Sequence, residues 1–250
     1  MKKILIPLVL IIFLSIKASI SYSATCGDTI TQDTTLESDL KDCSGDGLIV
    51  GTDNITLRLN GHTISGTFAT GSNCNGTPTA GIKIDGRKDI EIIGPGKVEG
   101  FGDGLFINLG SDIRVEGITT AGNCRNGIAL INVSDSYIER STVSENKSHG
   151  IFLDTTTNTS ILGNTVSSNG TGGSCEGGGI RLISFSPLNN IEGNSVSKNG
   201  GDGIRLEKST YNNILATNTV SESASSCDDI HDLGTNSVVG DNVCKRGSCP

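Results

Sequence analysis

The sequence has no tryptophan, one methionine and only 4% aromatic residues, so large side chains cannot fill a conventional globular core. Basic residues are also in the minority, with 19 lysines and arginines against 27 acidic residues. An acidic chain is a poor partner for nucleic acid or an anionic membrane. What the sequence does have is glycine, 34 residues in all, so its modest apolar content must be arranged periodically if it is to form a core.

The N-terminus has the three-part layout of a secretory signal peptide. Lys2 and Lys3 precede an apolar run from Ile4 to Ile16, and small residues follow as far as Ala24. The run is too short for a membrane span of roughly 20 residues. We therefore predict cleavage near Ser23 or Ala24 and a secreted or periplasmic protein with no stable membrane insertion. The mature chain keeps 16 basic residues against the same 27 acidic ones.

Eight cysteines follow the predicted leader, and an even number in an exported chain is typical of disulfides. None forms a CxxC pair, so a zinc-type site is not expected. Spacing leaves many pairings open. The predicted set is Cys26 with Cys43, Cys74 with Cys124, Cys175 with Cys227, and Cys244 with Cys249.

A repeat of about 23 residues organises the rest of the chain. Strings such as GIKID, GIFLD and GIRLE begin at Gly81, Gly104, Gly127, Gly150, Gly179 and Gly203, at steps of 23, 23, 23, 29 and 24. The longer step is explained by an insertion around Cys175. Each repeat also has a second short strand and a closing apolar position. The predicted closing residues are Val98, Ile118, Val143, Val166, Val196, Val220 and Val243.

Three short strands per repeat cannot bury their inner faces alone, but they can when successive coils stack. We therefore predict an all-β, single-stranded, right-handed parallel β-helix of about eight coils. Leucine-rich repeats share the period, but their leucine and asparagine consensus is missing. The predicted organisation is a signal peptide over residues 1–24, an N-terminal cap over 25–47, the β-helix over 48–243 and a C-terminal tail over 244–250.

Asparagines recur just before the closing valines, which indicates a turn column with a structural role. Side-chain amides stacked in this way can hydrogen-bond along the solenoid axis, and asparagine tolerates left-handed turns. The predicted column is Asn164, Asn194, Asn218 and Asn242.

The segments CGDTITQDTTLESDLKDC and LIVGTDNITLRLNGHTISG, followed by GI strands and GNTV or GNSV turns, resemble the bacterial right-handed β-helix repeat proteins of the pectate-lyase-like superfamily. The resemblance covers nearly all of the mature chain. It implies the fold, but its members include polysaccharide lyases, glycoside hydrolases, uronan epimerases, tailspikes and a periplasmic accessory protein of copper-enzyme maturation. Fold alone therefore assigns no activity.

No complete catalytic signature of these enzymes is found. A galacturonan hydrolase would place an Asp-Asp pair before its histidine, whereas Asp228 and Asp229 follow His149. The Asp-Pro-His cluster of an alginate epimerase is missing. We predict no cofactor and no metal. A Ca²⁺ ion would find a compact acidic group only around Asp228, Asp229 and Asp232, and copper handling is disfavoured because only three histidines are present, widely spaced.

Alternation along the first strand of each repeat assigns residues to an outward face. The predicted substrate-binding residues on this face are Lys83, Asp85, Phe106, Asn108, Phe152, Arg205 and Glu207. Aromatic rings can stack on sugars while cations bind carboxylates, so the predicted partner is an acidic polysaccharide or cell-surface glycan. If the protein is an enzyme that cleaves or epimerises this polymer, it is expected to be a polysaccharide lyase, glycoside hydrolase or uronan epimerase. The predicted acid, base and substrate clamp are then Asp154, His149 and Arg181, with His149 expected to be exposed.

Two alternatives stay open. The charged residues can be a solvated sheet face with local ion pairs of little energetic weight. The whole chain can also be a non-catalytic structural or adhesive rod of the cell surface or periplasm. The sequence indicates neither the oligomeric state nor whether the chain is an enzyme.

Overall fold

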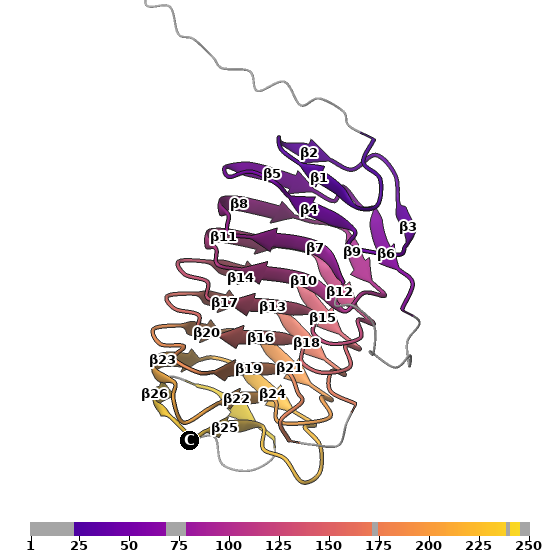
Figure 1. Cartoon of the computed structure of the whole chain (residues 1–250). Helices are drawn as coiled ribbons and strands as arrows, with labels where there is room; N and C mark the ends of the chain where they lie inside the picture. The colour runs from indigo at the N-terminus through magenta and orange to yellow at the C-terminus, as the bar shows by residue number, and fades with distance from the viewer. Residues whose placement is uncertain (1–22, 69–78, 172–174, 239–240, 246–250) are drawn as a thin grey trace, which may run out of the picture.

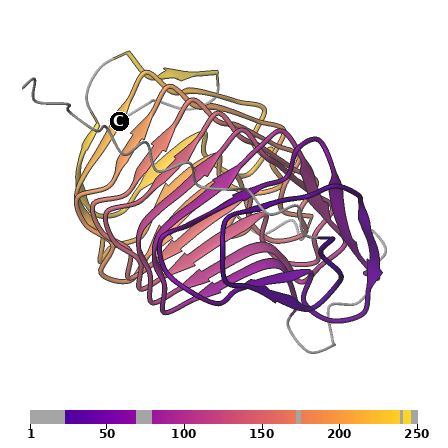
Figure 2. The same ribbon diagram turned by 90° about the horizontal axis from the view of Figure 1, so that it is seen from above.

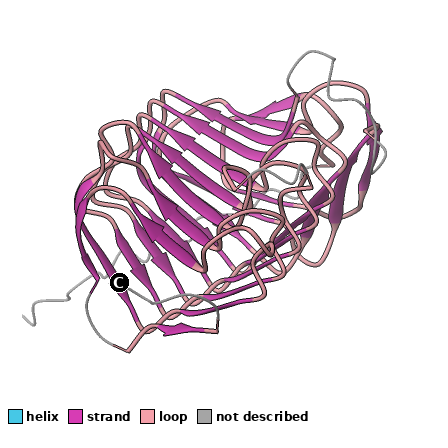
Figure 3. Cartoon of the chain, turned by 90° about the horizontal axis from the view of Figure 1, so that it is seen from below, coloured by secondary structure: helices cyan, strands magenta, loops and turns pink. Residues whose placement is uncertain are grey.

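The computed structural model describes residues 23–68, 79–171, 175–238 and 241–245, and within these ranges the chain forms 27 strands. The strands wind into stacked coils with one strand of each coil on each of three sides (Figure 1). The described ranges contain only strands and loops (Figure 3), so no helix there is long and apolar enough to cross a membrane. Apart from its last two residues, the predicted signal peptide lies outside these ranges.

Three nine-stranded sheets run the length of the solenoid, and the paired strands of the described residues are parallel. The first sheet contains β1 (Asp28–Ile30), β4 (Leu48–Val50), β7 (Ala80–Asp85), β10 (Asp103–Asn108), β13 (Ile128–Ile131), β16 (Ile151–Asp154), β19 (Ile180–Ile183), β22 (Ile204–Leu206) and β25 (Ile230–Asp232).

The second sheet contains β2 (Thr34–Thr35), β5 (Ile55–Arg58), β8 (Lys88–Ile93), β11 (Ser111–Glu116), β14 (Tyr137–Glu139), β17 (Ser160–Leu162), β20 (Asn190–Glu192), β23 (Tyr211–Ala216) and β26 (Thr235–Val238). The third contains β3 (Leu40–Cys43), β6 (Thr63–Gly66), β9 (Lys97–Glu99), β12 (Thr119–Ala121), β15 (Thr142–Ser144), β18 (Thr165–Ser167), β21 (Ser195–Ser197), β24 (Thr219–Ser221) and β27 (Val243–Cys244).

The core is a set of apolar columns, because in-register pairing places equivalent residues of successive coils directly on one another. Ile151 of β16 pairs with Ile180 of β19, and Ile180 pairs with Ile204 of β22. All three are fully buried. The alternation of inward and outward residues therefore confirms the predicted β-helix, and Figure 2 shows the coils stacked one behind another.

Glycine opens each GI strand because the neighbouring sheet and the next coil leave no room for a side chain there. A Cβ on Gly150 would lie 2.5 Å from Cγ1 of Val166 and 2.8 Å from the carbonyl oxygen of Gly179. The first contact is with the third sheet and the second with the next coil. Any side chain at this position would therefore push a sheet or a coil away, which explains why glycine recurs with the repeat.

The predicted asparagine column forms a buried ladder along the axis. The side-chain amide of Asn164 donates to Oδ1 of Asn194 over 3.0 Å, and Asn194 donates to Oδ1 of Asn218 over the same distance. Its left-handed residues are those that precede the asparagines, such as Gly163 with φ 60°, and not the asparagines themselves.

Two further ladders were not predicted. Both also stack amides at turns of successive coils. They comprise Asn123, Asn146, Asn169 and Asn199 in one turn, and Asn189, Asn213 and Asn236 in another.

Three details differ from the sequence-based expectation. The solenoid has nine coils instead of about eight, because residues 25–47 contribute β1, β2 and β3 to the sheets although they lack the GI signature. Thr120, and not Ile118, pairs with Val98 and Val143 as the inner residue of β12. Cys244, and not Val243, pairs with Val220, and Val243 is exposed. The expected inner position was thus two residues off in β12 and one residue off in β27.

Disulfides join Cys26 to Cys43 and Cys175 to Cys227, as predicted. The second one ties the insertion before β19 to the turn before β25, two coils further along. Cys124 and Cys244 are also disulfide-bonded, but their predicted partners Cys74 and Cys249 lie outside the described residues, as does most of the predicted tail.

Replacement of Asn194 by alanine tests the ladder. The backbone N–H and side-chain amide of Asn164 would lose their acceptor, and the carbonyl of Ile161 would lose its donor. Because buried unsatisfied groups are costly, we expect a loss of about 2–4 kcal/mol, measured by guanidinium unfolding. The control is Asn190→Ala on the adjacent strand, where the amide bonds only to the carboxylate of Glu192 and little change is expected. Equal effects of the two substitutions would contradict the ladder's role.

Candidate functional site

The outer face of the first sheet brings the predicted binding residues together in two columns. The first column pairs consecutively across the strands, and His231 of β25 extends it beyond the residues named from the repeat. In order it comprises Lys83, Phe106, Ala129, Phe152, Arg181, Arg205 and His231. The second comprises Asp85, Asn108, Ile131, Asp154 and Ile183, and Glu207 follows the end of β22.

A cavity of about 240 Å³ lies at the N-terminal end of this face. Lys83 and Phe106 line it together with Asp46, Asp103 and Arg125. Nζ of Lys83 is 3.5 Å from the carboxylate of Asp46, and Arg125 donates to the carboxylate of Asp103. Both cations stay substantially exposed, with 39% and 41% of their side-chain surfaces accessible. A ligand on this face can therefore reach one aromatic ring and two cations.

Asp103 is the most buried charged group of this cavity. Burial raises the pKa of Asp103, although the charge of Arg125 and hydrogen bonds from Asn126 act in the opposite direction. Its Oδ1 accepts both the backbone N–H and the side-chain amide of Asn126, over 3.1 and 2.9 Å. The carboxylate thus ties one coil to the next as well as lining the cavity.

His149 is buried, and the expectation that it is exposed was wrong. Only 7% of its surface is accessible, and its ring stacks on Phe152 with the centroids 5.2 Å apart. Burial lowers the pKa of His149 to about 4, with a further contribution from the charge of Arg181. Its Nδ1 accepts the backbone N–H of Gly178 over 3.4 Å, so the ring is neutral and joins two coils.

The three residues predicted for catalysis are only partly brought together. His149, Phe152 and Arg181 are neighbours, since the ring stacks and the arginine acts on the histidine's pKa. Asp154 accepts a hydrogen bond from Thr155 in the described structure, which shows no bond from it to His149 or Arg181. Because the base is buried and the acid is not joined to it, the geometry does not favour this trio as a catalytic group.

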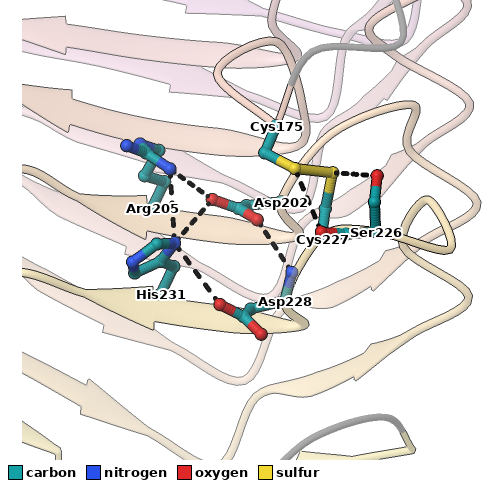
Figure 4. Close-up of a disulfide and its surroundings, with 7 residues drawn as sticks. All are labelled: Cys175, Asp202, Arg205, Ser226, Cys227, Asp228 and His231. Atoms are coloured by element: carbon teal, nitrogen blue, oxygen red, sulfur yellow. Dashed lines mark hydrogen bonds and ion pairs between the residues drawn. A yellow bond between two sulfur atoms is a disulfide. The ribbon is translucent and has the colours of Figure 1, made fainter.

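The C-terminal half of the face is a closed network of charges. Arg181 donates to Oε1 of Glu207 over 2.8 Å, and Arg205 donates to the same oxygen over 2.7 Å. Arg205 also donates to the buried carboxylate of Asp202 over 2.8 Å. His231 lies 3.1 Å from that carboxylate, and Asp202 stands between His231 and the disulfide of Cys175 and Cys227 (Figure 4). These arginines are therefore engaged within the protein.

Asp103, Arg125 and Asp202 were missed by the sequence interpretation, although a signal for the two aspartates was present. Each immediately precedes the glycine that opens a GI strand, as Asn126 and His149 also do. Side chains at this position accept the backbone N–H of the next coil, as Asp202 does from Asp228 over 2.8 Å. No sequence pattern pointed to Arg125, because its ion pair with Asp103 joins residues of two neighbouring coils.

A larger hollow of about 420 Å³ lies on the second sheet. Tyr137, Glu91 and Arg114 line it with three aspartates of successive turns. The guanidinium of Arg114 is held by Glu116 and Glu139 over 2.8 and 2.7 Å. The exposed ring of Tyr137 makes this face a useful comparison for the aromatic residues of the first sheet.

The stacked coils, three parallel sheets and polar ladders define a single-stranded, right-handed parallel β-helix. The chain belongs to the NosD family, whose profile, described as periplasmic copper-binding protein (NosD), matches residues 16–243. No curated protein matches the chain by sequence.

Among solved structures, the chain is similar to the A-module of mannuronan C-5 epimerase AlgE4 from Azotobacter vinelandii, with TM-score 0.57 and 18% identity over 87% of this chain and 65% of the epimerase module. An alginate lyase from Paenibacillus sp. str. FPU-7 gives 0.60 and 13%, covering 85% of this chain and 88% of the lyase. Tailspike protein 2 of Escherichia coli O157:H7 bacteriophage CAB120 gives 0.62 and 15%, over 90% and 34%. At these identities the likeness shows the fold.

The buried state of His149 leads to a pH dependence that can be measured. Its pKa is depressed on folding, so its contribution to stability is complete above pH 6.5 and is lost as the pH falls toward 4. This shift in pKa corresponds to roughly 3 kcal/mol in the free energy of unfolding. His149→Asn introduces the residue type found at position 126 of the preceding coil. We expect this substitution to remove the part of the pH dependence of the melting temperature that comes from His149. An NMR titration of His149 giving a pKa near 6.5 would contradict the burial.

Proposed function

We propose that this chain is an exported protein that binds a linear acidic polysaccharide along the N-terminal half of the first sheet's outer face. The observation that carries the proposal is the in-register column of Lys83, Phe106, Ala129 and Phe152. It combines two aromatic rings and a cation beside a cavity. Such groups suit a sugar chain, because rings stack on sugar faces and cations bind carboxylates.

The spacing of the rings supports a polymer lying parallel to the solenoid axis. Phe106 and Phe152 are two coils apart, and coils are separated by about 4.8 Å, so the rings are about 9.6 Å apart. This is close to the length of a disaccharide unit. The residue between them is Ala129, the smallest side chain of the column. Every second sugar of an extended chain can therefore meet a ring.

The preference for an acidic polymer rests on Lys83 and Arg125. All four cations of the face are paired with carboxylates, but Lys83 and Arg125 keep 39% and 41% of their side-chain surfaces accessible. Arg181 and Arg205 keep only 18% and 13%. The second column adds Asp85 and Asn108, which share a hydrogen bond of 2.8 Å and can meet sugar hydroxyls. The binding site thus occupies the face from β7 to β16.

The structural neighbours are consistent with this proposal, since two are named as enzymes of mannuronan and alginate. The disulfides and the periplasmic description of the NosD family support export. We propose binding without cleavage, because His149 is buried and Asp154 is not bonded to it. The alternative is a structural rod, favoured by the ion pairs that close the C-terminal half of the face.

Affinity gel electrophoresis with polymannuronate, polygalacturonate and a neutral glucan tests the proposal. We expect at least one acidic polymer to retard the protein more than the glucan does. Phe106→Ala and Phe152→Ala should each weaken binding by roughly tenfold, as expected for the loss of one stacked ring. Lys83→Ala should reduce the preference for the acidic polymers, and this effect should fade at high salt.

The matched control is Tyr137→Ala, which removes an exposed ring from the second sheet and should leave binding unchanged. If Tyr137→Ala alone abolishes retardation, the polymer binds the second sheet and the proposed face is wrong. If no polymer retards the folded wild-type protein, the structural rod is the better description.

A further inference from the structure

The family description raises the question of where copper would bind in this chain. Copper sites in proteins use imidazole, thiolate and thioether ligands. All three histidines of the sequence lie in described ranges, and the one methionine is Met1. No cysteine of the described ranges is a free thiol. Any described site must therefore be built on a single histidine, because the three lie on different coils.

Two of these histidines belong to no group of three metal-ligand side chains in the described structure. Nδ1 of His62 is 3.3 Å from the carboxylate of Asp39 near the N-terminal end of the third sheet. His149 is buried, and its Nδ1 accepts the N–H of Gly178. Of the two groups with metal-ligand spacing in the described ranges, one depends on the disulfide sulfurs of Cys175 and Cys227.

The remaining group is Asp202, Asp228 and His231, whose ligand atoms lie within 4.8 Å of one another. Two carboxylates and an imidazole would suit a divalent cation by composition. Asp202 is almost completely buried, so its negative charge needs a positive partner.

A cation already lies beside two members of this group, Asp202 and His231, and Nδ1 of His231 is 3.4 Å from the carboxylate of the third member, Asp228. Nη1 of Arg205 donates to Oδ2 of Asp202 over 2.8 Å and lies 3.3 Å from Nδ1 of His231 (Figure 4). Its Nε donates to Glu207 over 2.7 Å, which fixes the guanidinium from the other side. The side chain is only 13% exposed. Since arginine stays charged at any relevant pH, a metal ion would have to displace it against charge repulsion.

We propose that Arg205 is a built-in cation that takes the place of a metal ion among Asp202, Asp228 and His231. This member of the NosD family consequently does not bind copper through its described residues. The proposal is independent of the polysaccharide site, which lies on the coils from β7 to β16.

The first test is a titration of tag-free, disulfide-intact wild-type protein with Cu²⁺ and with Zn²⁺, followed by calorimetry and, for Cu²⁺, by electron paramagnetic resonance. We expect no stoichiometric site with a micromolar or tighter dissociation constant. One equivalent of copper bound by the wild type and lost in His231→Ala would overturn the proposal. This result needs no variant of Arg205.

The second test is Arg205→Met, which keeps much of the side-chain volume and removes the charge. We expect the variant to gain one Cu²⁺ or Zn²⁺ site at least tenfold tighter than any binding by the wild type. Adding His231→Ala should remove the gained site. Arg205→Lys keeps a cation and should not gain it.

Arg181→Met is the matched control, because Arg181 also binds Glu207 but makes no contact with Asp202 or His231. It should gain no metal. A folded Arg205→Met protein without metal affinity, or an equal gain in Arg181→Met, would overturn the role given to Arg205. If Arg205→Met does not fold, the wild type, His231→Ala and Arg205→Lys decide the question.

Discussion

The structure depends on the parallel, in-register pairing of each coil with the next. This pairing places every residue directly above its equivalent, so each column must hold side chains that tolerate being stacked on their own kind. Isoleucine, leucine and valine satisfy this condition inside the solenoid. The turns cannot be apolar, because their backbone groups need partners, and stacked asparagines supply these partners while repeating with the coil. The repeat of glycine, valine and asparagine follows from this one constraint.

The stacking of coils also gives a structural role to polar side chains that would indicate a catalytic or binding site in another fold. Asp103, Asn126, His149 and Asp202 each precede the glycine of a GI strand, and each accepts a backbone N–H from the following coil. A buried histidine with a low pKa is often a functional signal. Here the low pKa of His149 has a structural cause, since a ring that accepts a hydrogen bond and stacks on Phe152 between two coils is held away from water.

Those parts of the fold that repeat could be read from the sequence, and those that connect coils through individual side chains could not. The spacing of GI strings determines which residues of β7 to β22 face outward. It does not reveal β1 to β3, whose sequence lacks the string, or the turn offsets that place Thr120 and Cys244 inward. The pairing of Arg181 with Glu207 was also out of reach, because these residues of neighbouring coils meet only through side-chain conformations. Alternation alone gave Arg181 and Arg205 the same outward position as Lys83.

The residues of the outward column therefore follow one sequence pattern, but the two halves of the column differ in how accessible their charged side chains are. From β7 to β16, Lys83 and Arg125 are also paired with carboxylates, but 39% and 41% of their side-chain surfaces stay accessible, so a ligand can reach them. From β19 to β25, every cation is matched by a carboxylate of this chain, and a ligand or metal would first have to break those pairs. Breaking a buried pair leaves Asp202 uncompensated, which is the costly step. We therefore propose that ligands bind only the half of the face from β7 to β16, and that the ion pairs of Arg205 keep a metal ion away from Asp202.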